Sequence, residues 1–352
     1  MTRIRVGEGP AGYDVRVGPL AAGLEDLRVP GRLAVVSDER VWGLHGPAIR
    51  DRFDTVPLLV PDGEEAKDWP VLHELLRRLA ELDPDRATPL LALGGGSVGD
   101  LAGLAAALFK RGIPVVHVPT TLLAQADSAV GGKTAIDFAG QKNLVGTFHA
   151  PALVLADPAL LATLDSRQMR SGFAEVVKYG VIDDAGFFAW LEDHGGDVLG
   201  GHADHLAHAV ATSIRAKARM VTGDERDLKG QRALLNLGHS FGHAIEAEAG
   251  IGRLLHGEAV GIGMVLALRF SAALGHGGAG EASRLEALLA KAGLPTSLAQ
   301  AGVPGEALVR HMASDKKNEG AGLTLILAHG IGQAFVARGV PAERVRAFLA
   351  TA

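Results

Sequence analysis

The sequence of 352 residues contains no cysteine, which excludes disulfide bonds, thiolate nucleophiles and cysteine-ligated metal sites. Any metal ion bound by this chain must therefore be held by imidazole and carboxylate groups. Aromatic residues make up only 5% of the chain, so the core is built mainly from Leu, Val, Ile and Ala. No apolar run reaches the roughly 18 residues that a membrane span needs, and the N-terminus lacks an apolar signal core. We expect a cytoplasmic protein with no membrane partner.

The chain also lacks an excess of positive charge. Its formal net charge is −5 at pH 7, which argues against a nucleic-acid partner because such proteins usually carry a basic face. An anionic small molecule remains a possible ligand if cations are gathered locally. The length favours two domains, and 47% hydrophobic residues with 47 glycines are typical of a compact α/β protein with many tight turns.

Short apolar runs in the first half predict strands that are buried on both faces of a parallel sheet. They begin at residues 33, 56, 89 and 113. Ligands of open α/β sheets bind at the carboxyl ends of the strands. Asp38 follows the first run, and Glu64 and Lys67 follow the second. These charged residues are either ligand contacts or solvated loop residues.

The third run leads into a glycine-rich segment, Gly94–Asp100, which precedes a predicted helix. Glycines 94, 96 and 99 satisfy the G-x-G-x-x-G spacing, so backbone N–H groups could approach a pyrophosphate at the start of the helix. The match is imperfect, because no acidic residue follows about 20 positions later, where Thr120 and Thr121 stand. The segment therefore predicts either a phosphate-binding loop or a structural glycine turn.

A dense polar segment, residues 125–143, follows the fourth run and predicts an irregular loop folded close to a ligand. Lys133 and Lys142, with Arg111 just upstream, could bind phosphate or carboxylate. The spacing does not match a P-loop.

The pattern changes to helical periods near Pro158. We therefore predict an α/β NAD-binding domain at residues 1–158, and a mostly α-helical metal- and substrate-binding domain at residues 159–352. Predicted helices of the second domain cover residues 167–180, 203–222, 229–248 and 259–270, with a short strand at residues 323–327.

One stretch of the second domain, Arg232–Glu246, is apolar on most sides when drawn as a helix. Arg232, Asn236, His239 and His243 then fall on a single stripe. Buried guanidinium, amide and imidazole groups are costly unless they are paired, so the stripe predicts a bound metal ion, an anionic ligand, or both. A solvated helix face is the alternative.

Glu175, His239 and His256 lie on separate predicted helices and form a set of two histidines and one carboxylate. Nitrogen and oxygen ligands without sulfur suit Zn²⁺ or Co²⁺. Glu175 and Lys178 could instead form an exposed intrahelical ion pair. The lysines and arginine that could surround a nearby anion are Lys133, Lys142, Lys178, Lys217, Arg232 and Lys316. Nucleotide, metal and phosphate sites in one chain suggest redox chemistry at a carbinol of a phosphorylated polyol.

Several motifs occur in an order that resembles the 3-dehydroquinate synthase family. They are GGGSVGDLAG, RGIPVVHVPTTLLAQADSAVGGKTAIDFAGQKNLVG, SGFAEVVKYG, LLNLGHSFGHAIE, LHGEAVGIGM and DKKNEG. The resemblance covers nearly the whole chain. It implies a dehydroquinate synthase-like fold, a homodimer, and conversion of 3-deoxy-D-arabino-heptulosonate 7-phosphate to 3-dehydroquinate and phosphate in the shikimate pathway. NAD⁺ is implied to be consumed and regenerated within one turnover.

The resemblance also implies a role for each matching residue. The implied metal ligands are Glu175, His239 and His256. The implied NAD contacts are Asp38, Asp62, Gly63, Glu64, Glu65, Ala66, Lys67, Gly96, Ser97, Val98, Gly99, Asp100, Thr120, Thr121, Lys133, Lys142, Leu160, Leu161, Ala162 and Thr163. The implied substrate contacts are Asp127, Lys133, Asn143, Lys178, Lys217, Arg232, Asn236, His243 and Lys316, with Arg111 reaching the phosphate across the dimer interface. The motif does not separate Lys316 from Lys317.

Two alternative functions share parts of this pattern. A sibling sugar-phosphate cyclase, such as a 2-deoxy-scyllo-inosose or valiolone-type synthase, would keep the metal and NAD residues and change the substrate contacts. Arg232 favours a carboxylate-bearing heptulosonate, since a guanidinium binds a carboxylate in a bidentate manner. A metal-dependent polyol dehydrogenase would not need so many phosphate-binding cations.

Overall fold

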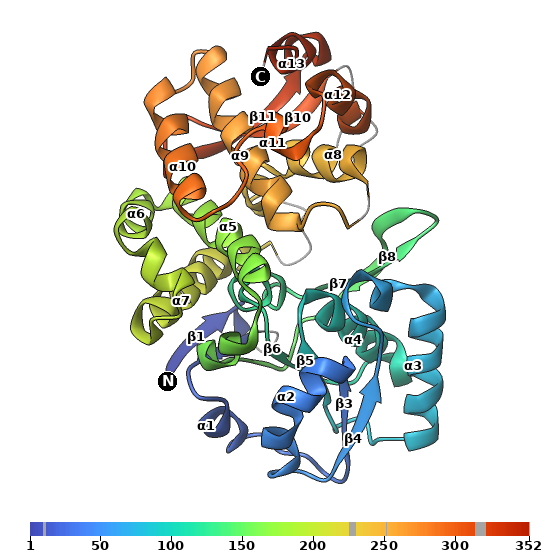
Figure 1. The fold of residues 1–352 in the computed structure, drawn as a ribbon. Coiled ribbons are helices and arrows are strands. Elements are labelled where there is room, and N and C mark those ends of the chain that lie inside the picture. The colour runs from blue at the N-terminus through green and yellow to red at the C-terminus, as the bar shows by residue number, and fades with distance from the viewer. Residues whose placement is uncertain (10–11, 225–229, 251, 314–321, 352) are drawn as a thin grey trace. The chain divides into compact units, whose positions relative to one another are not determined.

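The computed structural model describes residues 1–9, 12–224, 230–250, 252–313 and 322–351. It divides the chain into two units (Figure 1). Unit 1 comprises Met1–Asp165 and Leu206–Arg226, and unit 2 comprises Ser166–His205 and Asp227–Ala352. This division differs from the predicted ranges 1–158 and 159–352, because it falls after Asp165 and assigns the segment 206–226 to unit 1.

Unit 1 is built around a seven-stranded sheet with the order β1-β2-β9-β6-β5-β3-β4. The first two strands pair antiparallel and the others pair parallel. The strands of this sheet are β1 (Thr2–Val6), β2 (Tyr13–Val17), β3 (Leu33–Ser37), β4 (Thr55–Leu59), β5 (Leu90–Gly94), β6 (Val115–Pro119) and β9 (Leu153–Ala156). Within Met1–Asp165, the helices of unit 1 are α1 (Leu20–Leu24), α2 (Glu39–Arg50), η2 (Gly63–Lys67), α3 (Trp69–Leu82), α4 (Gly96–Leu108), η3 (Phe109–Arg111), η4 (Ala124–Ser128) and η5 (Pro158–Thr163).

Alternating side chains of the central strands enter two separate cores. Ala34 and Val36 of β3 pack with α3 and α4 on one face, whereas Leu33 and Val35 pack with α1 and α2 on the other. Figure 1 shows these helix pairs on their two sides of the sheet. Every residue of β3, β5 and β6 is buried, as predicted from their continuous apolar runs.

The segment 125–143 is more regular than the predicted loop. It begins with a π-helical turn, η4, and then enters a hairpin of β7 (Lys133–Phe138) and β8 (Gln141–Phe148). Ala139 and Gly140 connect the strands with positive φ angles of 51° and 75°. Two such residues make the tight turn that matches the twist of a hairpin.

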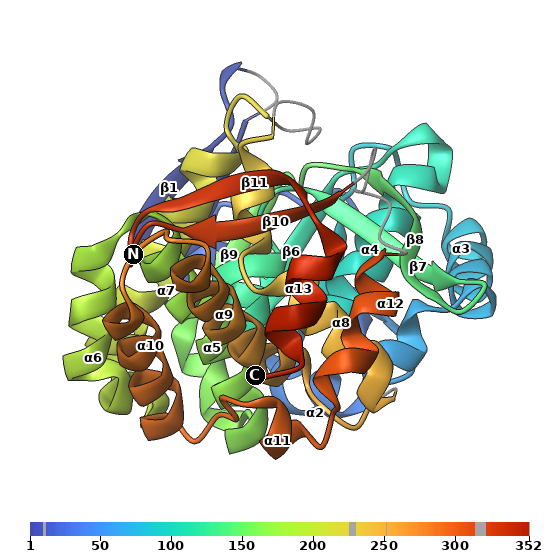
Figure 2. The same ribbon diagram turned by 90° about the horizontal axis from the view of Figure 1, so that it is seen from above.

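Unit 2 is mainly helical. Its elements are α5 (Ser166–Asp183), α6 (Ala185–Leu199), the first residues of α7 (Ala203–Val221), η6 (Arg232–Asn236), α8 (His239–Ala249), α9 (His256–Ala273), α10 (Ala279–Lys291), α11 (Leu298–Ala301), α12 (Gly305–Ala313), β10 (Leu323–Ala328), β11 (Ala334–Val340) and α13 (Ala342–Leu349). Helix α9 is almost entirely buried and packs against α5, α8, α10 and strand β10 of the hairpin β10–β11. Figure 2 shows this hairpin running alongside α9.

The prediction of one continuous helix over Arg232–Glu246 is wrong. Residues Arg232–Asn236 form a short 3-10 helix, Leu237 is extended, and Gly238 has a φ of 79°. A new helix, α8, begins at His239. Arg232 and Asn236 therefore do not share a helical stripe with the histidines.

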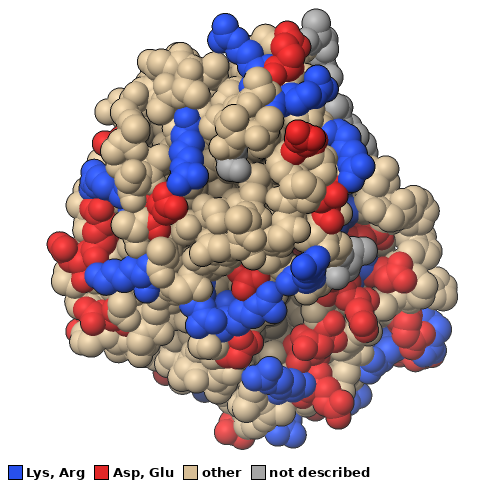
Figure 3. Space-filling view, turned by 45° about the horizontal axis from the view of Figure 1, so that its top comes forward, with Lys and Arg blue, Asp and Glu red and all other residues tan. Residues whose placement is uncertain are grey.

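None of the described helices is long and apolar enough to cross a membrane. On the face drawn in Figure 3, basic and acidic side chains are interspersed. This distribution fits the modest net charge of −5.

Candidate metal and nucleotide sites

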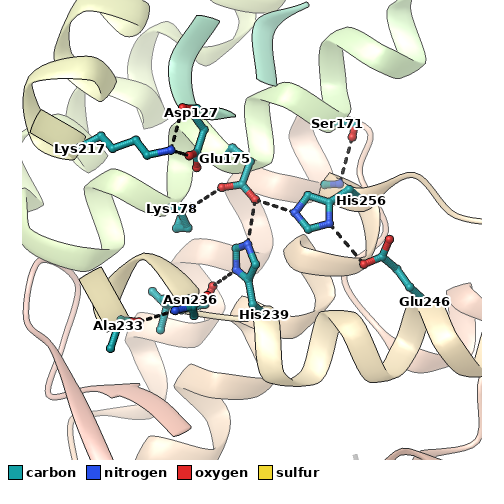
Figure 4. Close-up of polar contacts among 12 residues, drawn as sticks. Asp127, Ser171, Glu175, Lys178, Lys217, Ala233, Asn236, His239, Glu246 and His256 are labelled. Carbon is teal, nitrogen blue, oxygen red and sulfur yellow. Dashed lines mark hydrogen bonds and ion pairs between the residues drawn. The ribbon is translucent and has the colours of Figure 1, made fainter. Parts of the chain in front are cut away.

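Three helices of unit 2 bring Glu175, His239 and His256 together. The Glu175 Oε1 atom lies 3.6 Å from Nε2 of His239 and 3.4 Å from Nε2 of His256. The ligand atoms of the three residues all lie within 4.8 Å of one another. Figure 4 shows both imidazole rings pointing toward the Glu175 carboxylate. The structure therefore assembles the predicted metal ligands from α5, α8 and α9.

Each imidazole has an acceptor for its other ring nitrogen. His239 Nδ1 lies 3.1 Å from the Leu237 carbonyl oxygen, and His256 Nδ1 lies 3.3 Å from Glu246 Oε2. When Nδ1 carries a proton and donates it to these oxygens, the lone pair of Nε2 is available for a metal ion. This is the arrangement of metal-bound histidines. The donor set and its tautomers thus fit a divalent cation with nitrogen and oxygen ligands.

The environment of the histidines shifts their pKa values in opposite directions. Burial lowers the pKa of His239 to about 3. Burial also acts to lower the pKa of His256, but hydrogen bonds to the carboxylates of Glu175 and Glu246 outweigh it and raise this pKa to about 10. At neutral pH His239 is therefore neutral, whereas His256 is a cation until a bound metal ion displaces its Nε2 proton.

Lys178 lies one helical turn after Glu175 and is 1% exposed. Its Nζ atom lies 2.5 Å from Glu175 Oε2, on the side of the carboxylate away from the imidazoles (Figure 4). The pair is therefore not the exposed ion pair that the sequence left as an alternative. The lysine fixes the carboxylate so that Oε1 faces both histidines.

Close backbone packing sets the positions of the ligands. Gly238 has a φ of 79°, and a Cβ atom there would lie 2.7 Å from the Met264 nitrogen and 2.9 Å from the Val260 oxygen. A Cβ atom at Gly257, next to His256, would lie 1.9 Å from the Ser171 oxygen of α5. Only glycine allows these contacts, which hold α9 against α5 and against the start of α8.

Other predicted residues of unit 2 are placed as follows. Arg232 is 2% exposed and lies in η6, and Asn236 donates a hydrogen bond from Nδ2 to the Ala233 oxygen at 3.1 Å. His243 is exposed, with its ring centroid 5.3 Å from that of His239. His243, Glu246 and His256 form a second group with three possible ligand atoms. Lys316 and Lys317 lie outside the described residues.

In unit 1, the predicted nucleotide residues gather around the start of α4. Gly95 is the N-cap of this helix and has no side chain to occupy the first backbone N–H groups, so these groups suit an anion. Ser97 Oγ lies 3.2 Å from Glu64 Oε1. Lys67 Nζ lies 2.6 Å from Asp100 Oδ2 and also donates to Asn143 Oδ1.

These contacts join the η2 turn, the glycine-rich loop and β8. Lys67 is 4% exposed. Burial acts to lower its pKa, but the carboxylates of Asp100 and Glu64 outweigh it and raise the pKa, so the ammonium stays charged. The loop is therefore held at its helical end by an ion pair between a buried lysine and an aspartate whose side chain is 22% exposed.

Other predicted NAD residues of unit 1 are placed as follows. Thr120 donates its N–H to Gly94 O at 2.9 Å. Asp38 caps α2 by accepting from Val41 N at 2.8 Å. Thr163 of η5 contacts His45 at 3.0 Å, and Lys142 is exposed in β8.

A small pocket lies beside the glycine-rich loop. Asp100 lines it with Lys133 and Ser128 of the predicted polar segment, as does His117, to which the sequence interpretation gave no role. His117 is a polar residue inside the apolar run of β6, a signal that could have identified it. Burial, with a smaller effect of His149, lowers the pKa of His117 to about 4.

Two predicted substrate residues also meet within unit 1. Lys217 Nζ lies 2.7 Å from the Asp127 backbone oxygen and also contacts its carboxylate (Figure 4). Lys217 lies in the part of α7 that belongs to unit 1, which the predicted domain boundary did not anticipate. Arg111 is exposed at the end of η3.

Comparisons with known proteins agree with this architecture. The chain matches the family model "3-dehydroquinate synthase N-terminal" at residues 57–171 and "3-dehydroquinate synthase C-terminal" at residues 172–318. It is 49% identical over 361 residues to the 3-dehydroquinate synthase of Caulobacter vibrioides. This match covers 98% of this chain and 97% of that protein.

Two solved structures of sugar-phosphate cyclases share the fold, which confirms the predicted fold class. The 2-epi-5-epi-valiolone synthase of Streptomyces hygroscopicus subsp. jinggangensis, with NAD⁺ and Zn²⁺ bound, has a TM-score of 0.89 and 30% identity over 96% of both chains. A 2-deoxy-scyllo-inosose synthase complexed with carbaglucose-6-phosphate, NAD⁺ and Co²⁺ has a TM-score of 0.86 and 25% identity over 99% of both chains. From its sequence matches over nearly its whole length, the chain belongs to the 3-dehydroquinate synthase family.

Proposed function

We propose that this chain uses Glu175, His239 and His256, together with its cationic side chains, to convert 3-deoxy-D-arabino-heptulosonate 7-phosphate to 3-dehydroquinate and phosphate. The 3-dehydroquinate synthase activity, that of a phosphate-eliminating carbon–oxygen lyase, follows from family membership. The observation that supports the proposed site most directly is the convergence of two Nε2 atoms on Glu175 Oε1.

The three residues would hold Zn²⁺ or Co²⁺, and the residues around the glycine-rich loop would hold NAD. When bound, the ion would supply Lewis acidity at a substrate oxygen, and NAD⁺ would supply a hydride acceptor that is regenerated within one turnover. The chain itself contributes orientation: Lys178 holds one oxygen of Glu175, and the acceptors at Leu237 and Glu246 fix the imidazole tautomers.

The buried cations suit a substrate with a carboxylate and a phosphate. Arg232 and Lys178 are 2% and 1% exposed, so their charges act with little screening by water. A guanidinium offers two parallel N–H donors to a carboxylate, which favours a heptulosonate over an aldose phosphate. The other proposed substrate contacts are Asp127, Lys133, Asn143, Lys217, Asn236 and His243.

The proposed substrate contacts position the substrate more than they transfer protons. The substrate's own phosphate can accept the proton lost during elimination, so a site rich in lysine and arginine needs few dedicated bases. We also propose that the chain works in the cytoplasm as a homodimer in which the exposed Arg111 reaches the phosphate held by the partner.

The assay that tests this function incubates the purified chain with the heptulosonate 7-phosphate, NAD⁺ and Zn²⁺ or Co²⁺. We expect stoichiometric phosphate release without net accumulation of NADH, because the hydride is returned. Steady NADH formation from an unphosphorylated polyol would instead indicate a dehydrogenase.

A sibling cyclase activity is the second candidate, because the two solved structures of such enzymes share the fold. The same phosphate assay with glucose 6-phosphate tests it. Faster release from the aldose phosphate than from the heptulosonate would reject the proposed substrate, whereas the reverse order would support it.

A further inference from the structure

A separate cluster of side chains that could bind a metal ion lies at the turn between α6 and α7 in unit 2. The proposed function gives these residues no role. His194 and Asp197 lie three residues apart in the last turns of α6, and His205 lies in the first turn of α7. The possible ligand atoms of the three residues all lie within 4.8 Å of one another. His202 adds a fourth group, since its ring centroid is 4.5 Å from that of His205.

The spacing of the cluster fits a small transition-metal ion. Asp197 Oδ2 lies 3.0 Å from His205 Nδ1 and 3.6 Å from His194 Nδ1. Neighbouring ligands of a tetrahedral ion with bonds of about 2.1 Å are roughly 3.4 Å apart. The Nδ1 atom of His205 is itself buried and makes no hydrogen bond with a described residue, although it lies near the carboxylate. A buried ring nitrogen that lies beside a carboxylate without a hydrogen bond to it is suited to coordination of a cation.

The backbone holds these side chains in place before any ion binds. Gly201 has a φ of 77°, which reverses the chain at the end of α6. Gly201 N donates to Val198 O at 3.1 Å, and His202 N donates to Asp197 O at 2.9 Å. The turn is therefore closed by hydrogen bonds on both sides of the glycine. A site that is ordered in advance loses less entropy when it binds an ion.

The local charge also favours a cation. Residues 192–205 include four carboxylates and no lysine or arginine. Glu192 pairs with Arg284 at 2.6 Å, and Asp193, Asp197 and Asp204 are exposed. The carbonyl end of α6 adds partial negative charge at the same place.

From this geometry we infer that His194, Asp197 and His205 bind a borderline transition-metal ion such as Ni²⁺, Cu²⁺ or Zn²⁺, with His202 available as a further ligand. Imidazole and carboxylate ligands are typical of these ions. The bound ion links the end of α6 to the start of α7. This site is separate from Glu175, His239 and His256 and shares no ligand with them.

Trp190 gives a local reporter for binding. Its ring centroid lies 5.0 Å from that of His194 and 5.6 Å from that of His205. The chain contains three tryptophans, so a Trp42→Phe/Trp69→Phe variant of the full chain leaves Trp190 as the single indole emitter. Titration of this variant with Ni²⁺, which quenches nearby indole fluorescence, should give saturable quenching at one ion per reporter. Zn²⁺ should reverse it by competition.

Single substitutions in this reporter variant identify the ligands. His194→Ala and His205→Ala should each weaken the quenching affinity by roughly 100-fold or more, because loss of outer-shell partners alone weakens metal binding 10- to 100-fold. Asp197→Asn changes an exposed residue and provides a second test if a histidine variant fails to fold by circular dichroism. His311→Ala is the matched control: its imidazole is 30% exposed and contacts Glu248, compared with 29% exposure for His205 beside Asp197.

Three outcomes would overturn the inference. They are quenching that does not saturate, quenching that survives His205→Ala or Asp197→Asn in the folded protein, and quenching that disappears in a His256→Ala variant. The last outcome would assign the effect to the other metal site. Unchanged quenching in His311→Ala and His256→Ala, with loss in the cluster variants, is the result we expect.

Discussion

Glu246 should control how tightly unit 2 binds its metal ion. It acts through its contact with His256 and is not itself a ligand. Its Oε2 atom lies 3.3 Å from His256 Nδ1, and its side chain is 12% exposed. The carboxylate orients the imidazole and increases the electron density at Nε2. Glu246→Gln keeps an acceptor oxygen but removes the charge, whereas Glu246→Ala removes both.

The two substitutions should therefore differ in size. Loss of an outer-shell carboxylate weakens metal affinity by roughly 10- to 100-fold, or about 1.4–2.7 kcal/mol. We expect Glu246→Gln near the lower end of this range and Glu246→Ala near the upper end. The affinity can be measured by competition with a chromophoric zinc chelator at fixed pH.

Glu248, two residues later on α8, provides the matched control. It is a carboxylate of similar exposure, 18%, and it pairs with Arg310 and His311 away from the metal ligands. Glu248→Gln should leave zinc affinity unchanged. Equal losses in the Glu246 and Glu248 variants, or unchanged affinity in Glu246→Ala, would refute the role assigned to the His256–Glu246 contact.

Three further predictions concern stability. Gly238→Ala should cost about 1–3 kcal/mol of unfolding free energy in urea, because of its φ of 79° and the backbone atoms within 3 Å of a new Cβ. Gly250→Ala should cost less, because Gly250 has a φ of 95° but nothing lies within 4 Å of its Cβ position. Equal costs would reject the steric argument. Lys67→Met should cost about 2 kcal/mol in the same assay by leaving Asp100 without its ammonium partner, and Asp100→Asn should recover part of the loss; no recovery would argue against the ion pair. His117 has a folded pKa of about 4, compared with 6.5 for the ordinary side chain. The folded state is therefore most stable above pH 6.5, and about 3 kcal/mol of unfolding free energy is lost as the pH falls to 4. His117→Gln should flatten this part of the stability–pH curve, and an unchanged slope would contradict the assignment.

The inner strands of the central sheet could be predicted from sequence because they are almost entirely apolar. The runs at β3, β5 and β6 are buried on both faces, so composition alone marks them. Strands β1 and β2 were missed, because Arg3, Arg5, Asp14 and Arg16 alternate with their apolar residues. The hairpin β7–β8 was missed for a similar reason, since its lysine and glycine residues interrupt the alternation of apolar and polar side chains.

The candidate metal ligands were identified by residue type and by resemblance, but their convergence depends on backbone details. The predicted helix over Arg232–Glu246 overlooked the break at Gly238, where a positive φ and close packing on α9 decide the structure. Glu246 could not be assigned to His256 before the angle between α8 and α9 was known. Similarly, the contact between Lys217 and Asp127 joins segments 90 residues apart.

The proposed activity depends most on the binding of a catalytic metal ion by Glu175, His239 and His256. The direct test removes metal from the protein with a chelator and measures phosphate release from the heptulosonate 7-phosphate as Zn²⁺ or Co²⁺ is returned. We predict that activity is restored in the unmodified chain and in His205→Ala, and that it is absent at all metal concentrations in His239→Ala with the fold intact by circular dichroism. Near-normal phosphate release by the folded His239→Ala variant would contradict the metal assignment.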